Sequence, residues 1–559
     1  MNLLYPYFKL DGLNSFVILA TGLFSVFTLI YSTGFMKAQR KLFAYYTYII
    51  LTAIASILAV LANDLRLLVI FWGFLGLTLY LLINIADNDK ANLAAKKTFI
   101  IVGGSDALML LGVVIIYYLT GTFQMDKIKI SLPITYHLLP TIAYLCIAIT
   151  CFAKAGAMPL HTWIPDCAEQ APVPVVAYLP AALDKLLGIY LLARISLDLF
   201  VINEAMNIML MLVGAFTIIA AVMMALVQHN MKRLLGYHAV SQVGYMVLGI
   251  GTGIPIGIAG GIFHMLNNSL YKQALFLVSG NVEKKSGTTD LDKLGGLSKA
   301  MPLTYISCLI ASLAISGVPP FNGFVSKWMV YQGLIGRLTV NSAQFTASKL
   351  VAILCLVAAM FGSGLTLASF LKLLHATFLG QPVNRSTGQP TNEVKWTMWF
   401  PALTLAFICV VFGIFAYQIP LHYFIYPAVK GVDFMGIWSA NIATLLIIIG
   451  LVLGVLIFRL KWLAPSFRQD ITFVGGEGED FAQNRISGTE FYNTIKELGL
   501  LRAIYKRAEA GFFDLYEQGK KIIFSVSSVF QYLHNGILPT YIVWYLLGML
   551  GLFYILFFK

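Results

Sequence analysis

The chain has 559 residues, of which 59% are hydrophobic and only 11% are charged, and its formal net charge is +13. Because soluble domains carry about 25% charged residues, this composition excludes a soluble globular protein and indicates an integral membrane protein. In such a protein an excess of lysine and arginine is typical of loops that face anionic lipid, so the charge does not indicate a nucleic-acid partner.

Apolar runs of ~20 residues recur along the chain, each long enough for a helix to cross about 30 Å of hydrocarbon. They lack the period of two that barrel strands would show, so the spanning elements are predicted to be helices. The sequence therefore predicts an all-α polytopic membrane protein with about fifteen transmembrane helices, some of them broken. In chain order, these helices are expected at residues 13–33, 43–62, 66–85, 98–119, 139–158, 172–195, 207–228, 236–252, 255–281, 301–318, 322–337, 349–379, 398–418, 439–459 and 538–558.

The region after residue 460 differs from the rest of the chain. It begins with a polar stretch, and apolar residues then recur every three or four positions. This pattern predicts an amphipathic lateral helix along the membrane surface, which Gly499, Gly511 and Gly519 would bend. This helix is either a local surface helix of this subunit alone or a brace that lies against neighbouring subunits. The predicted organisation is a transmembrane domain at 1–460, a polar loop and lateral helix at 461–537, and a final transmembrane helix at 538–559.

Signals for a redox centre or a nucleotide site are missing from the sequence. None of the six cysteines forms a CxxC pair, which argues against an iron–sulfur cluster or a zinc site. The sequence contains no P-loop and no dinucleotide-binding fingerprint. The energy for transport is therefore expected to come from an ion gradient or from a partner subunit. The first helix lacks a secretory cleavage signal, so it is expected to remain as an anchor.

Ionisable side chains lie within the predicted spans or beside their breaks, where each buried charge costs several kcal/mol unless it is paired or hydrated. Such residues are therefore candidates for ion transport. A row of lysines and histidines suits proton transfer, because removal from water favours neutral lysine and histidine titrates near neutral pH. The candidates are Asp106, Lys154, His161, Lys185, His238, His264, Lys272, Lys327 and Lys372.

The sequence supports these candidates unequally. Lys154 and Lys185 flank a proline-rich break, and broken helices within a membrane occur only beside protein or water. Lys327 and Lys372 lie near helix ends, where snorkelling to the membrane interface is the alternative. Asp184 is not expected to pair with Lys185, since adjacent side chains on a helix do not face each other. It either serves a neighbouring helix or caps a kink.

Six motifs follow one another between residues 8 and 380: "LDGLNSF", "AKAGAMPLHTWIPDCAEQAPVPV", "MKRLLGYHAVSQVGYMVLGIG", "FHMLNNSLYKQALFLVSGNV", "LDKLGGLSKAMPLT" and "GVPPFNGFVSKWMV". In this order they resemble the antiporter-like subunits of respiratory complex I, of multisubunit cation/proton antiporters and of group 4 membrane-bound hydrogenases. The lateral helix followed by a last span resembles the subunit-5-like members, in which that helix braces neighbouring subunits.

The resemblance implies roles for several of the ionisable residues. Lys154 occupies the position of the lysine at the core of a proton half-channel, and Lys185 that of the lysine in the next helix, shifted by one residue. Lys272 matches the central-axis lysine, and Lys372 the terminal lysine or glutamate. Asp106 matches an aspartate position of the subunit-5-like branch.

The sequence departs from the family pattern at three places. Gly73 follows Trp72 where the family has a glutamate that modulates the first lysine. Either Asp106 or a residue of another subunit replaces that carboxylate, or ordinary pumping has been lost. Pro180 stands where the family has a histidine in the eighth-helix region. The chain also begins at the family's third helix, so a small partner is expected to supply the first two.

Three functions are compatible with this sequence. The first is an ion-translocating subunit of a complex I-like or hydrogenase-type oxidoreductase, which would move protons or exchange them for sodium. In that case iron–sulfur, flavin or nickel–iron centres are expected in peripheral partner subunits, with none in this chain. The second is a subunit of a free-standing cation/proton antiporter, and the third is a structural subunit that no longer conducts ions. Gly73 favours the third, whereas the retained lysines oppose it.

In all three cases the chain is expected in the inner or plasma membrane, among other membrane subunits and lipid. The basic residues of the loops give conflicting orientations under the positive-inside rule, so the orientation stays open. The identity of the electron donor and the choice between H⁺ and Na⁺ also stay open at this point.

Overall fold

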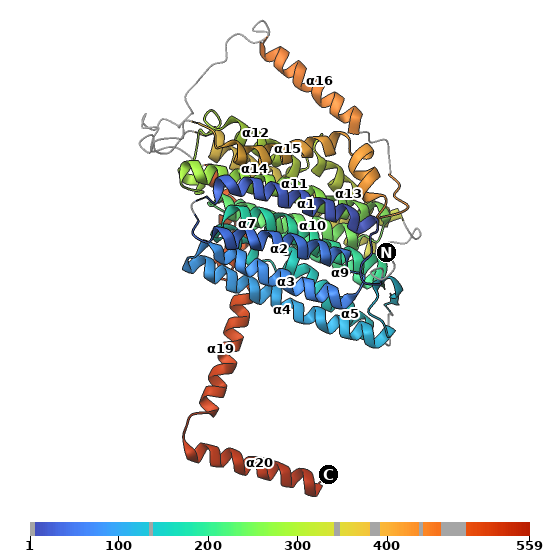
Figure 1. Ribbon diagram of the computed structural model, residues 1–559, viewed down its shortest axis with the longest axis vertical. Coiled ribbons are helices and arrows are strands. Elements are labelled where there is room, and N and C mark those ends of the chain that lie inside the picture. The colour runs from blue at the N-terminus through green and yellow to red at the C-terminus, as the bar shows by residue number, and fades with distance from the viewer. Residues whose placement is uncertain are drawn as a thin grey trace. The chain divides into compact units, whose positions relative to one another are not determined.

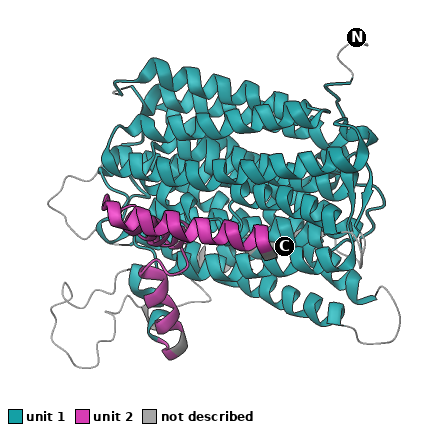
Figure 2. Ribbon diagram, turned by 90° about the horizontal axis from the view of Figure 1, so that it is seen from below, with its two compact units in different colours: residues 1–497 teal, residues 498–559 magenta. Residues whose placement is uncertain are grey.

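The computed structural model describes residues 6–37, 39–132, 138–339, 347–380, 392–434, 440–459 and 488–558. The described chain is almost entirely helical (Figure 1), and every segment predicted to span a membrane contains a helix. The all-α fold predicted from the sequence is therefore confirmed. The chain divides into two compact units, residues 1–497 and residues 498–559, which Figure 2 colours separately.

The first unit is a bundle in which long helices lie side by side with roughly parallel axes (Figure 1). Its first nine α-helices are α1 (Gly12–Phe35), α2 (Leu42–Leu61), α3 (Leu65–Ile83), α4 (Asp89–Thr120), α5 (Leu138–Ala155), α6 (Trp163–Gln170), α7 (Val173–Tyr178), α8 (Asp184–Arg194) and α9 (Glu204–Leu226). They are followed by α10 (Met231–Gly251), α11 (Pro255–Ser286), α12 (Pro302–Ser316), α13 (Asn322–Thr339), α14 (Ala347–Leu374), α15 (Trp396–Ile414) and α16 (Ala440–Arg459).

Short elements connect or extend these helices. The 3-10 segments are η1 (Asn84–Ala86), η2 (Met125–Lys127), η5 (Leu291–Lys293) and η8 (Gly488–Tyr492). The π-helical segments are η3 (Leu179–Leu183), η4 (Ile195–Leu199), η6 (His375–Leu379) and η7 (Tyr417–Ile425). Two strands of two residues each, β1 (Ile130–Ser131) and β2 (Phe200–Val201), pair in parallel.

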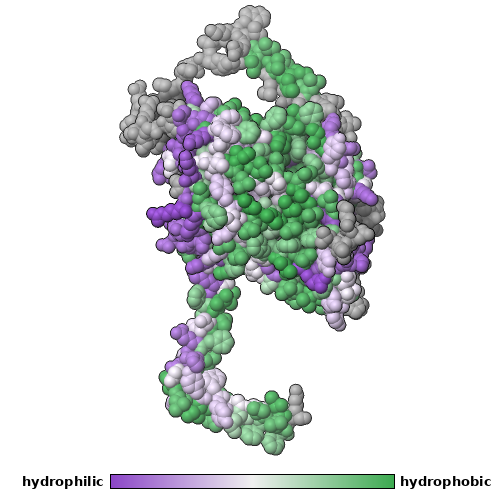
Figure 3. All heavy atoms as spheres, in the orientation of Figure 1, coloured by the Kyte–Doolittle hydropathy of each residue, from purple (hydrophilic) through white to green (hydrophobic). Residues whose placement is uncertain are grey.

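Ten helical stretches among the described residues are long and apolar enough to cross a membrane. Figure 3 shows apolar side chains over the middle of the bundle and hydrophilic ones towards both ends of its helices. α10 and α11 have spanning length but are not among the ten, because they carry many polar residues. Nearly all side chains of these two helices are buried, so their polar groups face other protein rather than lipid.

Two helices of the bundle are interrupted in the same way. Gly156 follows α5 with a φ of 82°, and Gly317 follows α12 with a φ of 81°. Glycine adopts this left-handed conformation at little cost, so each helix can end there. A cis proline bond lies three residues after the glycine at Pro159 and at Pro320. The helix breaks expected from the proline-rich motifs are therefore present.

The second break depends on a very close approach of two backbones. Gly323, at the start of α13, leaves no room for a Cβ, which would lie 1.9 Å from the carbonyl oxygen of Ala314 in α12. We expect Gly323→Ala to lower the free energy of unfolding by about 1–3 kcal/mol, since the two helices must move apart. Thermal unfolding of the purified protein measures this.

A matched control is available in α1. A Cβ on Gly22 meets no atom within 4 Å, so Gly22→Ala gains helix propensity without any clash. We expect this control to unfold at the wild-type temperature or slightly above it. Equal unfolding temperatures for the two alanine variants would contradict the tight contact between α12 and α13.

The end of the chain consists of α17 (Asn493–Glu497), α18 (Gly499–Glu509), α19 (Leu515–Leu533) and α20 (Leu538–Phe558). Of the three glycines expected to bend the lateral helix, Gly511 has a φ of 73° and separates α18 from α19, and Gly499 is the first residue of α18. Gly519 lies inside α19 without interrupting it. The predicted polar loop falls on residues 460–487, outside the described residues.

Candidate functional site

Eight of the nine ionisable candidates are buried inside the bundle. Lys154, Lys185, His238, His264, Lys272 and Lys372 are 0% exposed, Lys327 is 2% exposed and His161 is 7% exposed. The ninth, Asp106, is half-buried. The snorkelling alternative for Lys327 and Lys372 is therefore wrong, because neither ammonium group reaches the surface.

The first group of charges forms around Lys154, at the end of α5. Its Nζ lies 3.4 Å from Oδ1 of Asp184, and both side chains are almost completely buried. The same Nζ lies 5.2 Å from the centroid of the Trp72 ring. Asp184 thus pairs with a neighbouring helix, which is one of the two alternatives that the sequence left open. Lys185, the next residue of α8, points elsewhere and donates to the carbonyl oxygen of Ala155 at 3.0 Å.

The carboxylate of Asp106 approaches this group from α4. It is close enough to Lys154 for their charges to interact, and its Oδ2 would lie 3.4 Å from a Cβ on Gly76 of α3. Gly73, one turn earlier, is exposed, and a Cβ there would meet no atom within 4 Å. A glutamate at position 73 would therefore start on the outer face of α3. The acidic group that faces Lys154 from this side of the bundle is Asp106.

Three lysines bind carbonyl groups at the ends of helices. Lys185 binds the end of α5 through Ala155. Lys327 binds the end of α12, with Nζ 2.8 Å from the carbonyl oxygen of Ile315 and 3.4 Å from that of Ser316. The last carbonyls of a helix lack intrahelical partners and carry the negative end of its dipole.

Lys372 repeats this arrangement at the end of α9. Its Nζ lies 2.6 Å from the carbonyl oxygen of Leu226 and 2.8 Å from that of Gln228. A helix end offers an ammonium group about half of an elementary charge, which is less than a carboxylate does. Each of these three sites can therefore hold a protonated lysine without neutralising it fully.

Lys272 and the two histidines occupy the middle of the bundle, on α10 and α11. Nζ of Lys272 donates to the carbonyl oxygen of Leu235 at 2.9 Å. Nε2 of His238 lies 2.7 Å from the hydroxyl of Ser369. His264 contacts Ser326 through Nδ1 at 2.9 Å, and through Nε2 it contacts Oε1 of Gln242 at 3.0 Å and the Tyr271 hydroxyl at 3.3 Å.

The charges of these buried groups interact one after another along the bundle. We call the following set the lysine–histidine row: Asp106, Lys154, Asp184, Lys185, Lys272, His238, Lys327, Lys372 and His264. Electrostatic interactions join Asp106 to Lys154, Lys154 to Asp184, Asp184 to Lys185, Lys185 to Lys272, Lys272 to His238, His238 to Lys327 and Lys372, and Lys327 to His264. A change of protonation at one member therefore alters the electrostatic potential at the next member. His161 lies beside Tyr237, with 6.5 Å between the ring centroids.

Sequence reasoning missed several functional partners. Asp184 is not among the candidate transport residues predicted from the sequence, because the sequence does not show that its partner is Lys154 on another helix. A group of ion pairs around Asp166 was also missed. Asp166 binds Lys97 at 2.6 Å and Arg233 at 3.0 Å, and Arg233 also binds Glu169. The acids in "PDCAEQ" were the available signal, since they lie three residues apart on one face of α6.

The described residues contain no group of three or more histidine, cysteine, aspartate or glutamate side chains placed to hold a metal ion. All six cysteines are buried and none is in a disulfide.

Comparison with known proteins gives one family match. The pattern of the family described as NADH:quinone oxidoreductase/Mrp antiporter, transmembrane, matches residues 62–351. The Na(+)/H(+) antiporter subunit A1 of Staphylococcus haemolyticus is 31% identical over 422 residues, which cover 73% of this chain and 52% of that protein. Hydrogenase-4 component B of Escherichia coli is 30% identical over 429 residues, which cover 73% of this chain and 62% of that protein.

Two solved structures share the fold. The Mrp complex from Dietzia sp. matches with a TM-score of 0.67 and 23% identity, over 75% of this chain and 84% of that chain. The membrane-bound sulfane sulfur reductase, an archaeal respiratory membrane complex, matches with a TM-score of 0.79 and 20% identity, over 98% of this chain and 89% of that chain. The matched part of this chain covers only 52% to 63% of the length of the Na(+)/H(+) antiporter and hydrogenase-4 relatives.

Proposed function

Because this chain belongs to the NADH:quinone oxidoreductase/Mrp antiporter transmembrane family, we propose that it is an ion-translocating subunit of a multisubunit membrane complex. It would move protons, or exchange them for sodium ions, through the lysine–histidine row. The chain is a multi-pass membrane protein, as its apolar helices and its family indicate. The observation that carries the proposal is the set of buried lysines whose ammonium groups rest on backbone carbonyls.

The mechanism follows from the electrostatics of the row. The carboxylate of Asp184 lies 3.4 Å from the ammonium group of Lys154 and balances its charge. The charge of Asp184 also acts on Lys185, so a change at this carboxylate alters the charge balance at both lysines. A charge on Lys185 disfavours a second charge on Lys272, because like charges repel strongly where water is scarce. Protons would therefore advance by alternate occupation of neighbouring sites.

This arrangement argues against a purely structural subunit. Burying a lysine costs several kcal/mol when no carboxylate compensates the charge, and a subunit that only holds its neighbours in place gains nothing from that cost. Lys327 and Lys372 are bound by carbonyl oxygens in the described chain, and Lys272 by a single one. Gly73 does not weaken this argument, since position 73 faces outward.

Two energy sources are compatible with the same row. The similarity to Na(+)/H(+) antiporter subunits favours exchange driven by a gradient alone. The match over nearly the whole chain to a subunit of an archaeal respiratory complex favours redox-driven translocation, with iron–sulfur, flavin or nickel–iron centres in peripheral partners. We propose gradient-driven exchange as the first candidate, because the first three curated relatives are Na(+)/H(+) antiporter subunits.

The test uses the intact complex in sealed vesicles with a pH-sensitive dye inside. With an imposed pH gradient and no electron donor, we expect addition of Na⁺ to collapse the gradient. Formation of a pH gradient only after addition of an electron donor would assign the complex to the redox-driven class. If neither treatment moves protons, and vesicles without the complex behave identically, ion translocation itself is contradicted.

A further inference from the structure

A cavity of about 320 Å³ lies in the first unit, away from the lysine–histidine row. It is built where helices end: before the start of α1, between α2 and α3, after α4 at η2, and at η4 after α8. Since these helices are candidate spans, their ends lie at the level of the lipid headgroups. A cavity of this size is comparable to small-molecule sites, which measure about 300–1,000 Å³.

One wall of the cavity is an ion cluster that the protein satisfies internally. Arg194 binds both oxygens of Asp11 at 2.8 and 3.0 Å, and it binds Asp198 at 2.7 Å. Burial opposes ionisation of Asp11, but the hydrogen bonds from Arg194 and from the start of α1 outweigh it and keep the pKa of this carboxyl below its usual value. The charges of Arg194, Asp11 and Asp198 are therefore paired with one another, and this cluster offers no unpaired cation to a ligand.

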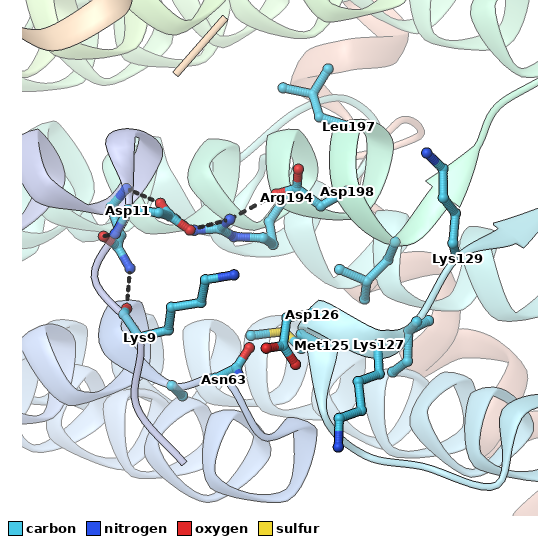
Figure 4. A pocket seen from close by; sticks show the side chains of 14 residues that line it. Lys9, Asp11, Asn63, Met125, Asp126, Lys127, Lys129, Arg194, Leu197 and Asp198 are labelled. Carbon is cyan, nitrogen blue, oxygen red and sulfur yellow. Dashed lines mark hydrogen bonds and ion pairs between the residues drawn. The ribbon is translucent and has the colours of Figure 1, made fainter. Parts of the chain in front are cut away.

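Other charged groups of the cavity have no such partner. Figure 4 shows the Lys9 side chain extending into the cavity between the Asp11–Arg194 pair and Asp126, with Lys129 on the far side. Among the described residues, no ion pair joins Lys9, Lys129 or Asp126 to any other side chain. Lys127 also lines the cavity, and no ion pair joins it to another described side chain, so three cationic groups and one carboxylate remain available to a ligand.

The carboxamide of Asn63 adds an independent observation. Asn63 lines the cavity and is 4% exposed, yet its Nδ2 has no hydrogen-bond partner among the described residues. Buried polar groups are usually hydrogen-bonded, so an unsatisfied amide at a cavity wall indicates a missing partner.

We propose that this cavity binds a zwitterionic phospholipid headgroup, in which a phosphate is joined to a primary ammonium. The phosphate lies between Lys9 and Lys129, and the ammonium faces Asp126. A simple anion fits less well, because it would leave Asp126 facing a negative ligand. Exposed apolar side chains that could contact acyl chains follow lining residues in the sequence: Leu10, 68% exposed, comes after Lys9, and Val201, 48% exposed, lies two residues after Leu199.

The test measures binding of phosphatidylethanolamine with a labelled acyl chain to the purified complex in mixed micelles. Each lysine near a phosphate contributes roughly a fivefold gain in affinity, so we expect the double variant Lys9→Gln/Lys129→Gln to bind about twentyfold more weakly. The control Lys90→Gln/Lys299→Gln removes the same charge from two exposed lysines outside the cavity, and it should bind like the wild type. Equal affinities for the two double variants would overturn the proposal.

Two further arms identify the ligand. Unlabelled phosphatidylethanolamine should displace the label better than phosphatidylglycerol, and Asp126→Asn should abolish this preference. Inorganic phosphate should fail to displace the label at concentrations where the lipid succeeds. Displacement by inorganic phosphate at lipid-like concentrations would assign the cavity to free phosphate, and a preference for phosphatidylglycerol would contradict the role of Asp126.

Discussion

Lys154→Ala is expected to abolish most ion transport by the intact complex and to destabilise the protein as well. The ammonium group of Lys154 is the nearest charge to Asp184, at 3.4 Å, and both side chains are buried. Removing one partner of a buried pair leaves an uncompensated charge, which costs about 3–5 kcal/mol. Transport should fall by about tenfold or more, because the row loses the proton site whose charge Asp184 balances. Dye-monitored transport in vesicles and thermal unfolding measure the two effects.

The double variant Lys154→Met/Asp184→Asn separates these two effects. It removes both charges, so the buried carboxylate no longer lacks a partner, and we expect most of the lost stability to return. Transport should remain low, since the proton site is still missing. Recovery of transport in the double variant would mean that Lys154 matters only for folding.

Lys272→Met is expected to stop transport with little loss of stability. Lys272 is completely buried but has a carbonyl oxygen of Leu235 as its hydrogen-bond partner, so its removal strands no buried charge. Methionine fills a similar volume and does not require desolvation of a cation. Unfolding temperature should stay close to wild type or rise, while transport falls by about tenfold or more, because Lys272 connects Lys185 to His238.

The neighbouring residue provides the control. Gln273 is equally buried in α11 but points to α1, where Nε2 donates to the carbonyl oxygen of Phe24 and the hydroxyl of Thr28. Gln273→Met should lower stability by about 1–3 kcal/mol, since it leaves buried acceptors unpaired, and should retain transport. Loss of transport in both variants with equal loss of stability would show that disturbance of α11, rather than loss of the Lys272 proton site, explains the result.

Lys185 and Lys327 make equivalent contacts, each with the end of one of the two broken helices. α5 and α12 each end at a glycine in the left-handed conformation, and a lysine from a later helix binds the freed carbonyls. A broken helix presents the negative end of its dipole inside the membrane domain, where it can stabilise a cation. The proposed transport therefore uses the breaks as binding elements.

The amino-acid sequence alone was enough to predict the class of protein and the positions of its helices. Apolar runs of spanning length can form only helices in lipid, because every backbone group must be hydrogen-bonded within its own segment. It also identified the buried lysines and histidines, since a charge inside an apolar run is costly wherever the helix packs. The motif order then indicated the family, which the match over residues 62–351 confirms.

Which of these ionisable groups contact one another depends on the packing of the helices and could not be predicted. Asp184 and Lys185 are adjacent in the sequence, but successive side chains on a helix diverge, so Asp184 pairs with Lys154 of α5 while Lys185 turns to a carbonyl. Helix rotation likewise placed Gly73 on the outer surface and Asp106 beside Lys154. The cavity lined by Lys9 and Asp126 unites residues from the segment before α1 and from three connections between helices. Such contacts depend on how helices rotate and pack against one another, and the hydrophobic pattern of a single helix does not specify its neighbours.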